Sequence, residues 1–79
     1  MAVEIVYLEP GEGLPEIDRW MLIETDPDGG FLITGAGQHP EGHNVYYSER
    51  AEELSAAIEA SQHWCIERGV TKIFVQEVP

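Results

Sequence analysis

The stretch at positions 19–36, RWMLIETDPDGGFLITGA, combines two strand-like segments with a turn signal between them. Residues 19–25 and 30–36 are rich in the aromatic, aliphatic and β-branched side chains that strands favour. The segment DPDGG at positions 26–30 predicts a hairpin turn, because Pro27 presets φ and glycine accepts a positive φ. This stretch therefore predicts a β-hairpin.

On both sides of this hairpin the sequence predicts further elements. Three more strands are expected, near residues 3–8, 45–47 and 71–78. A helix is expected near residues 49–68, since Ser48 is a favourable N-cap and Gly69 a favourable C-terminal stop.

The fold class that these elements predict is α+β, in a single domain of residues 1–79. We expect a mostly antiparallel sheet of four or five strands with one long helix packed on one face, in the order β-β-β-β-α-β. The strand–helix–strand passage at the end favours a last strand parallel to its neighbour. The sequence leaves open whether the first strand joins the main sheet.

The composition limits the classes of function. A single cysteine, Cys65, excludes an intrachain disulfide and favours a reducing compartment, and its helical phase predicts a core residue rather than a nucleophile. The chain begins without a basic leader, and no apolar run approaches the roughly 20 residues of a membrane span, so we expect a cytoplasmic protein. Fifteen acidic against four basic residues give a net charge of −11, which argues against binding nucleic acid or an anionic membrane.

The strands carry apolar side chains at consecutive positions, so both faces of the sheet are expected to be apolar. One helix covers only one face, and a large exposed apolar patch usually marks an interface. We therefore expect a homodimer that forms through the uncovered face. The alternative is that the first strand and the loop at residues 9–16 fold over that face. The candidate interface residues are Met21, Ile23, Leu32, Tyr46, Trp64 and Phe74.

His39 and His43, with Glu41 between them, raise the question of a metal site. The proline and glycine in this segment exclude the helix on which a zinc-protease motif places its histidines. Closed structural zinc sites use four ligands, and His63 and Cys65 cannot both supply one, because residues two apart on a helix point roughly 200° apart. We therefore expect two solvated loop histidines, and predict no metal, cofactor or catalytic residue. A metal-binding protein that uses His39 and His43 remains an alternative.

Three short segments form a pattern found in a known family. They are DGGF at residues 28–31, Pro40 and Gly42 in the following loop, and SERAEEL at residues 48–54. Over residues 20–65 this pattern resembles the HicB-type antitoxins. The resemblance implies three strands, a helix and a strand, in a domain that binds and silences a small basic RNA-cleaving toxin. The chain departs from the family where a Leu-Pro-Gly pattern is common before the helix, and no binding residue is carried over.

Three functions follow from these observations. The first is a small, non-enzymatic accessory or regulatory binding domain that self-associates through its sheet. The second is an acidic neutraliser of a basic protein partner, as the resemblance implies. The third is a metal-binding protein.

Overall fold

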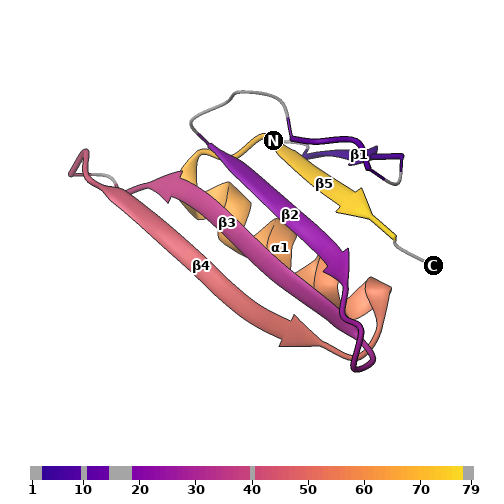
Figure 1. Cartoon of the computed structure of the whole chain (residues 1–79). Coiled ribbons are helices and arrows are strands. Elements are labelled where there is room, and N and C mark those ends of the chain that lie inside the picture. The colour runs from indigo at the N-terminus through magenta and orange to yellow at the C-terminus, as the bar shows by residue number, and fades with distance from the viewer. Residues whose placement is uncertain (1–2, 10, 15–18, 40, 78–79) are drawn as a thin grey trace.

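The computed structural model describes residues 3–9, 11–14, 19–39 and 41–77. The elements are β1 (Glu4–Tyr7), β2 (Trp20–Thr25), β3 (Phe31–Gln38), β4 (Asn44–Ala51), α1 (Leu54–Arg68) and β5 (Lys72–Gln76), shown in Figure 1. Several residues of the expected elements lie outside the described residues, namely Pro10, Pro15 and Glu16 of the first loop, Pro40, and Val78 of the last strand.

The five strands form one mixed sheet in the order β1-β5-β2-β3-β4, and α1 lies across one of its faces (Figure 1). The expected α+β class is confirmed. The order of elements along the chain and the parallel last strand are as predicted. The sheet is mixed rather than mostly antiparallel, because β5 pairs parallel with both β1 and β2 while β2, β3 and β4 pair antiparallel. The strand order in the sheet also differs from the order along the chain. The cause is α1, which carries the chain back across the sheet, so that β5 runs parallel to β2. The edge of β5 that does not pair with β2 pairs with β1.

The turn between β2 and β3 is formed as predicted. Gly29 and Gly30 have φ values of 103° and 79°, in the region that glycine tolerates best. The Asp26 carboxylate accepts a hydrogen bond from the Asp28 N–H at 2.9 Å. The turn fixes the register of the hairpin, and with it the face on which each side chain lies.

The boundary between β4 and α1 differs from the prediction. β4 continues to Ala51, because its last residues pair with the first residues of β3. α1 begins only at Leu54, so the prediction that Ser48 caps the helix is wrong, and Ser48 lies inside the strand. The actual N-cap residue, Glu53, makes no side-chain capping hydrogen bond. The other end is as predicted, with Gly69 at φ 73° as the C-cap.

The core lies between α1 and the sheet face that α1 covers. Its buried members are Met21, Ile23, Ile33, Ile73 and Val75 from the strands, Ala57 and Cys65 from α1, and Val70. Gly37 of β3 lies on the same face, and a Cβ atom built there would be 2.9 Å from the Trp64 ring. The absence of a side chain at this position therefore lets α1 approach the sheet.

The opposite side of the sheet, here called the open face, is not covered by α1 (Figure 1). Alternate strand positions point to it, including Trp20 and Leu22 of β2 and Phe74 of β5. Phe74 and Ala36 are buried yet lie outside the core cluster beneath α1. Both faces of the sheet are thus apolar, as expected.

Candidate functional site

Apolar side chains gather on the open face over β2, β3 and β4. We call Trp20, Leu22, Leu32 and Tyr46 the open-face patch. Trp20 and Tyr46 flank the buried Ala36 in one row across the three strands. Leu32 is 38% exposed and Tyr46 is 77% exposed, while Trp20 and Leu22 are half-buried. This is a place where a partner would bury apolar area.

Two of the predicted interface residues belong to the other face. Met21 and Ile23 are fully buried beneath α1, so their assignment to an interface is wrong. The hairpin register is the reason, because it turns these two positions toward the helix and leaves Trp20 and Leu22 on the open face. The prediction that β2 has apolar side chains on both faces is confirmed. The residues assigned to the interface, however, lie on the face that α1 covers.

The other predicted interface residues have different surroundings. Trp64 is half-buried on α1 and packs against the ring of Tyr47, with ring centroids 5.3 Å apart, so it belongs to the edge of the core. Phe74 lies on the open face but is only 3% exposed, which makes it a support for neighbouring side chains rather than a contact residue. Leu32 and Tyr46 are exposed on the open face and are the two predicted residues that a partner could reach.

The loop after β1 covers the open face on its β1–β5 side. The Gln76 side-chain N–H groups donate to the carbonyl oxygens of Glu9 at 3.0 Å and Glu12 at 2.8 Å. Because Gln76 points to the open face, this loop lies against this side of β5, and Leu8 at its start is buried. The alternative that the first strand folds over this face is wrong, because β1 is paired with β5 inside the sheet; only its loop lies against the face. Among the described residues, the open-face patch lies over the remaining strands.

The strand residues that point to the open face are balanced in charge, although the chain carries −11 and the acidic residues Glu9 and Glu12 lie in the loop on the β1–β5 side. The ionisable strand residues that point to it are Glu4, Glu24, Arg50 and Lys72, two of each sign. The exposed glutamates of α1, Glu59 and Glu67, lie on the other side of the sheet. A second acidic molecule therefore meets less like charge on the open face than on the helix side.

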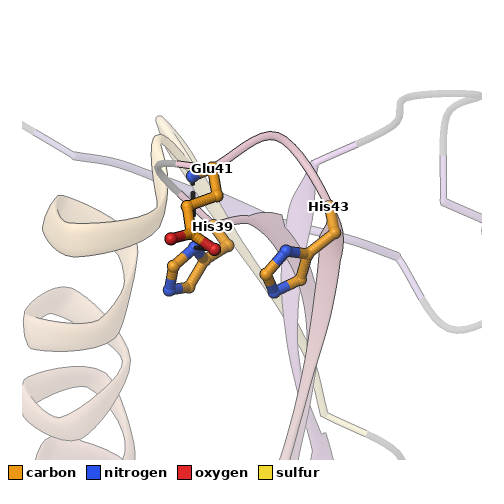
Figure 2. Close-up of side chains that lie close together, drawn as sticks. All are labelled: His39, Glu41 and His43. Carbon is orange, nitrogen blue, oxygen red and sulfur yellow. Dashed lines mark hydrogen bonds and ion pairs between the residues drawn. The ribbon is translucent and has the colours of Figure 1, made fainter.

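A second candidate site is the loop between β3 and β4, which brings His39, Glu41 and His43 together (Figure 2). The backbone N–H of His39 donates to the backbone carbonyl oxygen of His43 at 2.8 Å. The backbone N–H of Gly42 donates to the backbone carbonyl oxygen of His39, also at 2.8 Å. Gly42 has a φ of 100°, which a short hairpin loop of this kind requires. The two backbone bonds place the histidines opposite each other at the base of the loop.

The side chains of this loop also interact. The two imidazole rings stack with centroids 4.4 Å apart and planes 12° apart. His39 Nδ1 accepts the Glu41 N–H at 3.1 Å and lies 4.0 Å from the Glu41 carboxylate (Figure 2). One nitrogen of each histidine and one oxygen of Glu41 lie within 4.8 Å of one another. The expectation of two solvated histidines describes His43, which is exposed, but His39 is half-buried. It also misses this convergence, which the hairpin pairing creates.

Cys65 and His63 are apart from both candidate sites. Cys65 is fully buried on α1, and burial raises the pKa of its thiol to about 11, which suits a core residue and not a nucleophile. His63 is exposed on α1. This outcome agrees with the helical phase read from the sequence.

No helix in the part of the chain that the structure describes is long and apolar enough to cross a membrane. Comparisons with known proteins find no matching family model, no matching curated protein and no matching solved structure.

Proposed function

We propose that this chain is a non-enzymatic binding domain that pairs with a second copy of itself through the open face. The observation that carries the proposal is the open-face patch, whose apolar side chains remain accessible although α1 covers the other face. Burying one large apolar side chain contributes about 1.5–3 kcal/mol. Association gains only the part of this energy that folding has not already gained, since Trp20 and Leu22 are half-buried and Leu32 is 38% exposed, so Tyr46 at 77% exposure has the most to contribute.

The size of the molecule sets how much of its surface a dimer interface has to use. A stable interface buries about 800 Å² on each partner, or roughly a sixth of the 5167 Å² that this chain exposes. A dimer therefore has to cover the whole open-face patch.

The charges of the open face favour a second copy as the occupant. A two-fold axis places the same surface of each copy against the other, so acidic and basic residues of one face can lie opposite their counterparts. The strands present Glu4, Glu24 and Lys72 on the open face, together with Arg50, which pairs with Asp26 of its own chain at 2.9 Å. A face whose strands carry both signs of charge repels a second copy less than a uniformly acidic surface does.

Sedimentation velocity at micromolar concentration tests the proposal. We expect the wild-type chain to sediment as a dimer, and Leu32→Glu to weaken dimerisation by at least about tenfold because it places a charge in the apolar contact. Tyr46→Glu is expected to act in the same way. Both positions are exposed, so the substitutions leave the core in place.

Ile66→Glu is the matched control. Ile66 is 56% exposed on α1, and α1 lies against the face opposite the open face. The control should sediment like the wild type. A wild-type chain that remains monomeric over the whole concentration range, or a loss in Ile66→Glu equal to that in Leu32→Glu, contradicts the proposal.

A second candidate function is the neutralisation of a basic protein, and two observations favour it. The run β2–β3–β4–α1–β5 has the three strands, helix and strand that the resemblance to HicB-type antitoxins implies. The acidic surplus of the chain attracts a basic partner over distances set by salt screening. In this case the occupied surface is acidic, in contrast to the balanced open face.

Capture from an extract of the source cell at low salt distinguishes the two candidates. We expect a basic partner to be retained in stoichiometric amount, released by added salt, and retained less well by a Glu59→Gln, Glu67→Gln double variant. Leu32→Glu should retain it as well as the wild type does. Failure to recover any basic protein argues against this second function and leaves the dimer proposal unaffected.

A further inference from the structure

We propose that His39, Glu41 and His43 form a binding site for a divalent transition-metal ion of the Zn²⁺ class. This inference goes beyond the proposed dimer, because the three residues lie on the β3–β4 loop and the site does not require a second copy. The donor set of two imidazoles and one carboxylate suits borderline cations such as Zn²⁺. Hard cations such as Mg²⁺ and Ca²⁺ prefer oxygen ligands and should not compete.

The distances are close to those of a bound state. Ligand atoms about 2.0–2.2 Å from a tetrahedral ion lie roughly 3.4 Å from one another. In the structure the three atoms lie within 4.8 Å of one another, so no pair has to approach by more than about 1.4 Å. The Glu41 side chain is 79% exposed and the His39 side chain 36% exposed, which leaves room for rotation. The two 2.8 Å backbone bonds hold the main chain of the loop while the side chains adjust.

The imidazole geometry defines what has to change on binding. The lone pairs of an imidazole lie in the ring plane, so two rings stacked 12° from parallel direct their lone pairs side by side. One ring has to rotate for both nitrogens to face the same ion. His39 Nδ1 faces the Glu41 carboxylate, and its ligation replaces the hydrogen bond that it accepts from the Glu41 N–H. That N–H then bonds to water, since the loop is exposed.

The neighbouring arginines limit the affinity for a cation. A depression of about 260 Å³ beside His39 is lined by Arg19, Arg68 and Glu67. The two guanidinium groups repel a metal ion, and the Glu67 carboxylate, which would attract one, lies 3.8 Å from Arg68 and is partly neutralised by it. Three protein ligands also leave at least one coordination position to water. A site of this kind should bind zinc with micromolar rather than nanomolar dissociation constants.

Isothermal titration calorimetry of protein without a histidine tag tests the site. We expect one zinc ion per chain and no heat with magnesium. His39→Ala and His43→Ala should each weaken zinc binding by at least about tenfold, and Glu41→Gln should weaken it to a smaller degree. In an amide correlation spectrum, zinc should shift the signals of Gln38, His39 and residues 41–44 and leave those of α1 in place.

His63→Ala is the matched control, because His63 is an exposed histidine on α1. It should bind zinc like the wild type. The proposal is overturned if saturating zinc produces neither heat nor shifts, if His63→Ala loses as much affinity as His39→Ala, or if the stoichiometry is half an ion per chain with a zinc-dependent dimer. Sedimentation of the zinc-free chain reports on the open-face dimer separately, so either proposal can fail alone.

Discussion

At Gly37 the chain has no room for a side chain. A Cβ atom there would lie 2.8 Å from the Arg68 Cβ and 2.9 Å from a ring carbon of Trp64, distances that force α1 away from β3. We expect Gly37→Ala to lower the free energy of unfolding by about 1–3 kcal/mol, the usual effect of overpacking. Urea denaturation followed by circular dichroism measures it.

Gly13→Ala is the comparison for this prediction. A Cβ atom at Gly13 would have nothing within 4 Å, and its φ is not positive. This variant should stay within about 0.5 kcal/mol of the wild type. Equal stabilities of Gly37→Ala and Gly13→Ala would show that α1 does not pack against β3 at this point.

The positions of glycines indicate which face of the sheet the helix covers. The pattern of apolar residues alone does not indicate this. Consecutive apolar residues in β2 show that both faces are apolar but not which face the helix covers. The hairpin turn, which was predicted correctly, pairs Met21 with Gly35, and Gly37 follows on the same face. A helix approaches a sheet most closely where side chains are missing, so this pairing assigns Met21 and Ile23 to the helix side. The interface prediction failed because it did not combine the turn with the glycines.

At the scale of elements, the start of α1 is weakly defined. The N-cap residue Glu53 makes no capping hydrogen bond, and the first turn of α1 contains no acidic residue. We expect Glu53→Ser to raise the free energy of unfolding by about 0.5–1 kcal/mol, because serine accepts a hydrogen bond from a free N–H of the first turn. Thermal and urea unfolding measure the difference.

Glu59→Ser is the control for the helix cap. Glu59 is exposed within α1, where serine is a poorer helix former than glutamate, so stability should fall by a few tenths of a kcal/mol. If both variants lose stability, the helix does not begin where the structure places it. Ser48→Ala should have no effect on helix capping, since Ser48 is a strand residue.

The difference between the predicted and the observed start of α1 has a physical cause. Ser48 followed by glutamates satisfies the local rules for a helix N-terminus. The same residues pair with β3 through the β3–β4 hairpin, and the ladder between these strands outweighs the local preference. The end of α1 was predicted correctly because Gly69 acts locally.

Non-local pairing also explains the β3–β4 loop. The sequence shows two histidines and a glutamate there, but it does not show that the hairpin stacks the two imidazole rings.

At the scale of the whole molecule, the sheet joins segments from both ends of the chain. β1 pairs with β5, so the first described strand is held by the last. The sequence predicts that α1 returns the chain parallel to an earlier strand, but it contains no signal for which edge β1 takes. The charge of −11 also belongs to this scale, because it follows from the whole composition rather than from any one element.

The overall charge gives the dimer a salt dependence of defined sign. Two chains of charge −11 repel each other at long range, whereas the open face that joins them is apolar and balanced in charge. Added salt shortens the range of the repulsion, from about 30 Å at 0.01 M to about 8 Å at 0.15 M, and leaves the apolar contact intact. We therefore expect the dimer dissociation constant to fall as sodium chloride is raised over this range, measured by sedimentation equilibrium.

A complex with a basic partner should respond in the opposite direction, because screening weakens attraction between opposite charges. Leu32→Glu provides the reference, since it should remain monomeric at low and moderate salt. A dimer that dissociates as salt increases would mean that charge pairs rather than the open-face patch hold the two copies together. In that case Leu32→Glu and Ile66→Glu would dimerise alike, and the interface would have to be sought among the acidic and basic side chains instead.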